Sequence, residues 1–189
     1  EEVLDYLYDL KGTGEDSYDV AGAAKGGSLF ETHFKLFQTA SETCEGIKQI
    51  YDFCHESVGQ VVIHKNEMVP PNSVVMVLDS WAHITNDGGF HDTHIHPNCS
   101  WCGIYCIEKG NSNQKTQNGI NRFHSPLNSS MVDAGNYYLQ AGAWDWEPRD
   151  GHLLVFPSYL MHSALPYSGD IDRIVISFNS TTVVQQEAV

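Results

Sequence analysis

From residue 61 onward the sequence is a succession of short segments rich in β-branched and aromatic residues, separated by turn-forming residues. Clear turns stand at residues 70–73 (Pro-Pro-Asn-Ser) and 86–89 (Asn-Asp-Gly-Gly). Many short strands at close spacing are typical of a β-sandwich or jelly roll. The sequence therefore predicts a mostly β fold, with strands at 61–63, 74–78, 80–84, 91–96, 100–107, 121–124, 137–140, 152–156 and 173–178.

The first third of the chain is predicted to be helical. A short helix is expected around Val3 to Leu10, and Ser28 with Glu31 has the spacing of a capping box. Apolar residues from Phe30 to Val58 recur at steps of three and four, which predicts one long helix or two helices broken near 39–42. We expect a single domain over residues 1–189, in which 1–58 form a helical lead-in and support layer and 60–182 form the jelly-roll core.

Composition narrows the classes of partner. The net charge of −14 argues against binding to nucleic-acid phosphates and against docking on anionic membranes. No apolar stretch reaches the roughly 20 residues of a membrane span, and the odd number of five cysteines precludes complete internal disulfide pairing. We expect a cytoplasmic protein that acts on a small-molecule substrate, with no nucleic-acid or membrane partner, and a homodimer is an open expectation.

A metal site is predicted from three histidines. His94 and His96 are two residues apart, so on a strand they present their imidazoles on the same face. His162 follows the apolar segment 152–156 and a Pro-Ser turn. Two ligands from one strand and a third from a distant strand are the arrangement that the double-stranded β-helix of cupins and iron oxygenases requires. Imidazole suits Fe(II), and open coordination positions admit oxygen and a co-substrate.

One carboxylate competes with this assignment. The usual iron oxygenase site has two histidines and one carboxylate. Asp92 lies two residues before His94 on the same strand face, so it is a rival ligand to His96 or a group that orients His94. His83, His91 and His124 are weaker candidates.

A cation follows the last histidine. Arg173 lies eleven residues after His162 at the start of a predicted strand. A guanidinium forms two parallel hydrogen bonds with a carboxylate, which suits a dicarboxylate co-substrate. The alternative is an ordinary ion pair between Arg173 and Asp170 or Asp172.

Aromatic and amide side chains are candidates for the pocket wall. They are Trp81, Asn86, Tyr105 and Trp144, although Tyr105 alternates to the face opposite Cys106. The polar segment 109–118 is expected to be a mobile loop. This loop and the segment 141–150, which holds Trp144 and Trp146, are candidates for a lid or a substrate wall.

Several motifs in this order resemble those of the 2-oxoglutarate- and Fe(II)-dependent oxygenases of the jelly-roll superfamily, over about residues 75–180. They are Ser80-Trp81, His94-x-His96-Pro97, Cys102-Gly103-Ile104-Tyr105-Cys106, the segment from Gly151 through Phe156-Pro157-Ser158 to His162, and Arg173-x-x-x-Ser177-Phe178-Asn179. Cys102 and Cys106 depart from the pattern, because the family tends to have Ser and Tyr there.

The resemblance implies a dioxygenase with Fe(II) as cofactor, 2-oxoglutarate as co-substrate and ascorbate as reductant. It implies hydroxylation of a small molecule or amino-acid-like substrate, with release of succinate and CO2. His94 and His162 would bind iron, and His96 would stand at the usual carboxylate position. Arg173 would bind the distal carboxylate of 2-oxoglutarate, with a further hydrogen bond from Ser177 or Asn179.

Two other function classes stay open. A cupin-type metalloenzyme that does not use 2-oxoglutarate would explain three histidine ligands. A non-catalytic metal-binding domain would use Cys99 and Cys102, whose Cys-x2-Cys spacing occurs in zinc sites.

Overall fold

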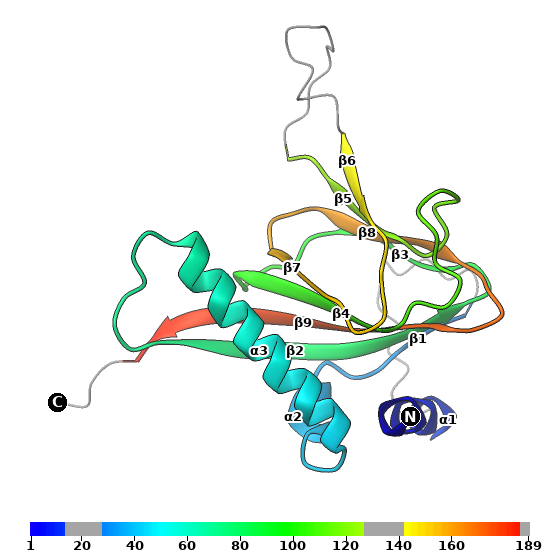
Figure 1. The fold of residues 1–189 in the computed structure, drawn as a ribbon, viewed down its shortest axis with the longest axis horizontal. Helices are drawn as coiled ribbons and strands as arrows, with labels where there is room; N and C mark the ends of the chain where they lie inside the picture. Colours follow the sequence, from blue (N-terminus) through cyan, green and yellow to red (C-terminus); the bar gives the residue numbers. More distant parts are fainter. Residues whose placement is uncertain (14–27, 127–141, 186–189) are drawn as a thin grey trace, which may run out of the picture.

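The computed structural model describes residues 1–13, 28–126 and 142–185. In this part of the chain two antiparallel sheets face each other and form the predicted jelly roll (Figure 1). The first sheet has the order β1 (Ser28–Glu31), β2 (Ser73–Asn86), β9 (Arg173–Val184), β4 (Trp101–Glu108) and β7 (Leu153–Pro157). The second has the order β3 (Gly89–His94), β8 (His162–Tyr167), β5 (Asn121–His124) and β6 (Ala143–Trp146).

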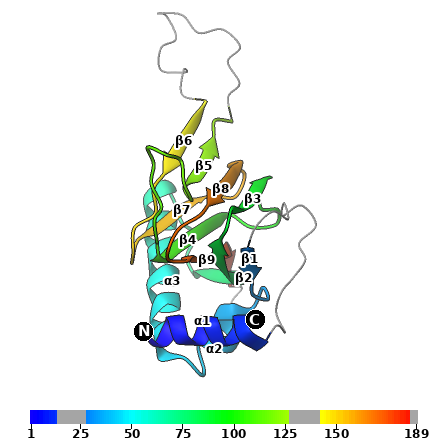
Figure 2. The ribbon, with the colours of Figure 1, turned by 90° about the vertical axis from the view of Figure 1, so that its right-hand side faces the viewer.

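Helices cover the outer face of the five-stranded sheet. They are α1 (Glu2–Thr13), α2 (Leu36–Ala40) and α3 (Glu45–Lys65), and Figure 2 shows α1 and α2 at the end of the molecule remote from β5 and β6. Their apolar residues share one buried cluster with Ile174, Ile176 and Phe178 of β9. Because side chains alternate along a strand, Arg173, Val175 and Ser177 point the other way, between the two sheets. The helical layer thus fixes which β9 residues reach the interior.

The structure corrects the predicted helix boundaries. Residues 28–31 form strand β1, in which Phe30 pairs with Ile84, so the capping-box pattern does not start a helix. The two-helix alternative is confirmed, with the break between Ala40 and Glu45. The predicted strand at 61–63 is wrong, since α3 continues to Lys65 and buries Val58 and Val62 one turn apart.

The strand predictions mostly hold. The two segments at 74–78 and 80–84 are one strand, β2, with an irregularity between Val77 and Asp79. The predicted strand at 137–140 lies outside the described residues. Strands β6 and β8 were not predicted, and β6 takes up the middle of the segment proposed as a lid.

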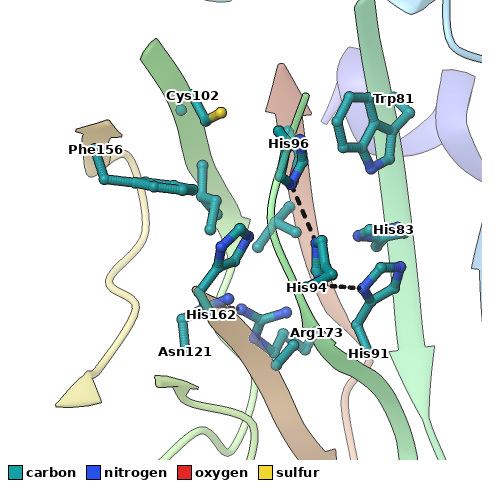
Figure 3. A pocket seen from close by; sticks show the side chains of 15 residues that line it. Trp81, His83, His91, His94, His96, Cys102, Asn121, Phe156, His162 and Arg173 are labelled. Carbon is teal, nitrogen blue, oxygen red and sulfur yellow. Dashed lines mark hydrogen bonds between the residues drawn. The ribbon is translucent and has the colours of Figure 1, made fainter. Parts of the chain in front are cut away.

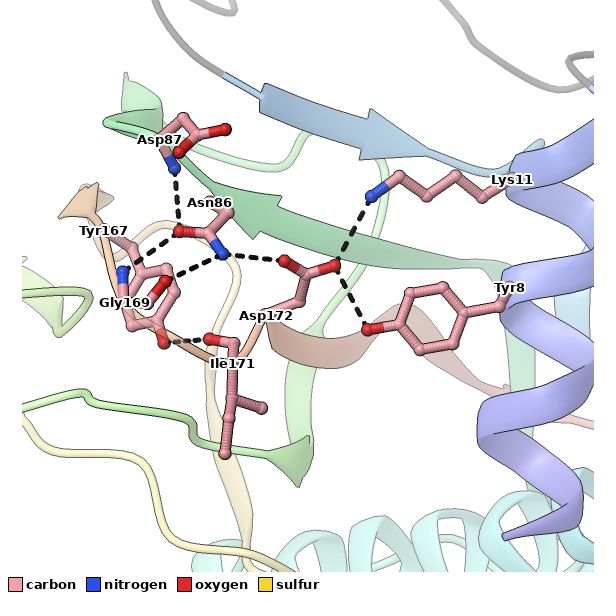
Figure 4. Close-up of polar contacts among 8 residues, drawn as sticks. All are labelled: Tyr8, Lys11, Asn86, Asp87, Tyr167, Gly169, Ile171 and Asp172. Atoms are coloured by element: carbon pink, nitrogen blue, oxygen red, sulfur yellow. Dashed lines mark hydrogen bonds and ion pairs between the residues drawn. The ribbon is translucent and has the colours of Figure 1, made fainter.

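A polar network joins α1 to the connection between β8 and β9 (Figure 4). Asp172 accepts hydrogen bonds from Tyr8 Oη at 3.1 Å, Lys11 Nζ at 3.4 Å and Asn86 Nδ2 at 2.8 Å. The same connection holds the 109–118 loop, because Asn118 donates to the Ser168 carbonyl at 2.9 Å. Asn86 and Asp172 therefore serve the scaffold.

No helix of the described chain is long and apolar enough to cross a membrane.

Candidate metal centre and anion pocket

The three predicted histidines meet between the sheets (Figure 3). Strand β3 ends at His94, β8 begins at His162, and the two residues are paired in the β3–β8 register. His94 Nε2 lies 3.1 Å from His96 Nε2, and the His162 ring centroid lies 4.4 Å from that of His94 and 5.1 Å from that of His96. One potential ligand atom from each of the three lies within 4.8 Å of the others. This spacing suits a single metal ion.

In all three rings the Nδ1 atom lies against an oxygen acceptor, and Nε2 is on the other side of the ring. The Nδ1 atoms of His94, His96 and His162 lie 2.6 Å from the Asp92 carbonyl, 2.7 Å from Asn179 Oδ1 and 3.0 Å from the Leu160 carbonyl, respectively. Each partner is an oxygen acceptor, so each Nδ1 carries the proton and each Nε2 keeps its lone pair. Oxygen acceptors that hold the Nδ1–H group orient metal-binding imidazoles in this way, and the residues therefore fit a divalent ion such as Fe(II).

Burial keeps the cluster neutral. Desolvation, reinforced by neighbouring imidazoles, lowers the pKa of His162 to about 3 and that of His96 to about 4, and desolvation also lowers the pKa of His94. All three rings are therefore unprotonated at neutral pH, as metal binding requires. Proton competition for the metal is expected at lower pH than the ordinary histidine range near 6.5.

Asp92 does not join the cluster. Asp92 is exposed, and its carboxylate does not lie within ligand distance of the three histidine nitrogens. The contact that the structure gives it is through the main-chain carbonyl, which holds His94 Nδ1. Of the roles predicted for Asp92, the structure favours orientation of His94 over metal ligation.

Arg173 is a buried cation without a carboxylate partner among the described residues. It is 2% exposed, and its Nη2 donates to Asn121 Oδ1 at 2.6 Å, whereas its buried Nε has no partner. Asp172, the predicted alternative partner, is bound to Tyr8, Lys11 and Asn86 instead. Burial lowers the pKa of Arg173, but a guanidinium starts so high that it stays charged. A buried charge with an unused donor is costly unless an anion completes it.

Two spaces meet at the histidines. The inner pocket is narrow, with a cavity volume of about 30 Å³, and Arg173, Ser177 and Asn121 are in its wall. The outer groove has a volume of about 550 Å³, and its wall includes Glu31 and Asp79. Trp81, His91, His94 and His96 line both. A metal ion at the cluster would therefore face an anion pocket on one side and a larger groove on the other.

Trp81 and Ser177 lie where the sequence placed them, in the pocket wall. Trp81 also stacks on His96, with the ring centroids 5.6 Å apart and the planes 14° apart. Asn179 lies in the outer groove, not beside Arg173. It contacts His96, Cys102 and Asp79, so the contact that the structure gives it on the histidine side is with His96 Nδ1.

Three other predicted wall residues line neither space. Asn86 belongs to the Asp172 network. Tyr105 packs under α3 against Phe53, with the ring centroids 6.1 Å apart. Trp144 is 55% exposed and lies beside Phe123.

Local sequence patterns do not predict Asn121 and Glu31 as site residues, and they indicate His83 and His91 only weakly. Asn121 orients Arg173 from β5, and Glu31 reaches His83 from β1. No local sequence pattern marks either contact, because each joins strands that are distant in the chain. His83 and His91 were considered weak candidates, and both line the inner pocket.

The predicted cysteine site gains no support. Cys99 Sγ and Cys102 Sγ are 3.7 Å apart, but no metal-ligand group within the described ranges includes them. Burial raises the pKa of both thiols, which disfavours the thiolate that zinc needs. A metal centre built on this pair is therefore not favoured.

Replacing Asn179 by alanine is expected to weaken metal binding about 10- to 100-fold, the usual cost of losing a partner that orients a ligand. The substitution removes the acceptor for His96 Nδ1, so the ring loses its fixed tautomer. Equilibrium dialysis with Ni(II) measures the effect. Asn86→Ala, which breaks an amide network away from the histidines, is the matched control, and equal affinity in the two variants would contradict the role of Asn179.

Residues 79–179, more than half of the chain, match the model of a protein family described as "Putative 2OG-Fe(II) oxygenase", where 2OG is 2-oxoglutarate. A search of curated proteins found no match.

Solved structures with a similar fold have low sequence identity. A Pseudomonas putida prolyl-4-hydroxylase is 15% identical, with a TM-score of 0.55 over 98% of this chain and 86% of its own. The non-heme α-ketoglutarate-dependent epimerase SnoN from nogalamycin biosynthesis is 10% identical, with a TM-score of 0.57 over 100% and 78%. HygX from Streptomyces hygroscopicus, solved with nickel and 2-oxoglutarate bound, is 10% identical, with a TM-score of 0.54 over 95% and 78%. These likenesses concern the fold.

Proposed function

Because the chain belongs to the 2OG-Fe(II) oxygenase family that matches residues 79–179, we propose that it is an Fe(II)- and 2-oxoglutarate-dependent dioxygenase. It would hydroxylate a small molecule or amino-acid-like substrate, with succinate and CO2 as the other products and ascorbate as the reductant in assays. His94, His96 and His162 would hold the iron.

The observation that carries this proposal is the unsatisfied guanidinium of Arg173 in the same pocket as the histidines. The distal carboxylate of 2-oxoglutarate would accept from Arg173 in a bidentate pair, which compensates both the charge and the unused Nε–H. Asn121 Oδ1 holds Nη2 and so fixes the plane of the guanidinium. Ser177, which lines the same pocket, is placed to add a hydroxyl donor.

The metal ion, the pocket wall and the outer groove would each have a separate role in the reaction. Bound Fe(II) would supply the oxygen chemistry that couples decarboxylation of 2-oxoglutarate to oxidation of the substrate. Trp81 and Phe156, both nearly fully buried, exclude water from the pocket wall. The primary substrate would reach the histidines from the outer groove.

Calorimetry with Ni(II)-loaded protein tests the proposal. Ni(II) replaces Fe(II) as a metal that does not turn over. We expect 2-oxoglutarate to bind only to the metal-loaded protein, because its 2-oxo acid end would need the ion and its distal end would need Arg173. Ni(II)-loaded protein that does not bind 2-oxoglutarate would reject the proposal.

A second candidate function rests on the composition of the cluster. Three histidines without a carboxylate suit a cupin-type metalloenzyme that does not use 2-oxoglutarate. The same titration separates the two, because such an enzyme would bind Ni(II) but not 2-oxoglutarate.

A further inference from the structure

A second group of potential ligands lies beside the three-histidine centre. Glu31, His83 and His91 come from β1, β2 and β3, and one ligand atom from each lies within 4.8 Å of the others. Glu31 is directly opposite His83 in the β1–β2 register. Figure 3 shows His83 and His91 next to each other at the edge of the pocket. Two imidazoles and one carboxylate are a common donor set for divalent transition metals.

The contact between Glu31 and His83 leaves one oxygen of the carboxylate unused. Glu31 Oε2 lies 2.5 Å from His83 Nε2, but Glu31 Oε1 is buried and has no hydrogen-bond partner within residues 1–13, 28–126 and 142–185. Glu31 is only 4% exposed, and the His83 side chain is 12% exposed. A buried carboxylate oxygen that lacks any partner is costly and rare. The vacant acceptor indicates that the group is built around something more than the histidine.

We propose that Glu31, His83 and His91 form a second metal site, which binds a divalent transition-metal ion such as Zn²⁺ beside the three-histidine centre. Glu31 supplies the negative charge that offsets half of the charge of the ion. The first centre has three neutral ligands, so the two sites differ in charge and in donor type.

The two sites are coupled through His91 and His94, whose Nδ1 atoms are 3.2 Å apart. A His91 ring that binds metal through its other nitrogen carries its proton on Nδ1. That N–H then faces the Nδ1–H that His94 donates to the Asp92 carbonyl. The two N–H groups repel, and so do two dications in neighbouring sites. Each ion should therefore weaken binding of the other, by the same factor in both directions.

Zinc stoichiometry of the full chain tests this site. Calorimetric titration, with bound metal counted by elemental analysis, should give two Zn²⁺ per wild-type chain, the second bound at least about 10-fold more weakly. Glu31→Gln keeps the size of the side chain and removes its charge, and His83→Ala removes one imidazole. Each variant should bind one Zn²⁺. His64→Ala, which removes an exposed histidine of α3, should bind two.

Circular dichroism and retention of the first Zn²⁺ show whether each variant is folded. One Zn²⁺ per wild-type chain would overturn the proposal, and so would two Zn²⁺ in folded Glu31→Gln and His83→Ala. Because 2-oxoglutarate takes no part in the measurement, either result is independent of the proposed oxygenase activity.

Discussion

Arg173→Ala is expected to lower succinate formation from 2-oxoglutarate by about 100-fold or more. Truncating one partner of a buried charge pair costs several kcal/mol, and about 1.4 kcal/mol is a factor of ten in rate or affinity. The variant should lose affinity for 2-oxoglutarate but bind metal as the wild type does, because Arg173 is not one of the potential metal ligands. Succinate release with Fe(II) and ascorbate, together with Ni(II) dialysis, measures both parts.

Two further variants make this experiment specific. Arg122→Ala removes another arginine, whose partner is Asp145, with Nε at 2.8 Å from Oδ1, and it should retain activity. Arg173→Lys keeps the charge but loses the planar pair of donors, so it should fall between the wild type and Arg173→Ala. Equal turnover of wild type and Arg173→Ala would remove Arg173 from the co-substrate site.

His162→Ala is expected to weaken metal binding at the three-histidine centre by at least about 100-fold and to abolish turnover. The substitution removes one of three donors, and losing a ligand should exceed the 10- to 100-fold cost of losing a partner that only orients one. Dialysis against Ni(II) in the Glu31→Gln background isolates this centre from the proposed second site.

The control for His162→Ala is His152→Ala, which removes an exposed histidine that precedes β7. It should bind Ni(II) as tightly as the parent. If His162→Ala also kept the affinity of the parent, the metal would not be held by the predicted histidines.

Local patterns of the sequence predicted the helical layer and the pairing of the histidines, although they wrongly predicted a strand at 61–63, which is the end of α3. The two-residue spacing of His94 and His96 predicted that their imidazoles lie together, although β3 ends at His94 and His96 follows it. The period of three and four residues predicted the helical layer. Such periodicities depend on backbone geometry within a few residues.

Local patterns gave wrong predictions where pairing with a residue far away in the chain determines the structure. Ser28 and Glu31 have the spacing of a helix cap, but pairing with β2 makes them a strand. This pairing brings Glu31 to His83. Likewise Asn179 was expected to bind a co-substrate, and the meeting of β9 with the segment after β3 directs it to His96 instead.

By itself, then, the sequence predicted the mostly β class, the meeting of His94, His96 and His162, and Arg173 as a candidate cation for the same site. Only the tertiary structure decided that Asp92 stays apart from the histidine cluster, that Asn121 and not an aspartate holds Arg173, and that Glu31 faces His83. The physical reason is that register between strands far apart in the chain is set by which faces are buried in the complete fold. No local pattern contains that information.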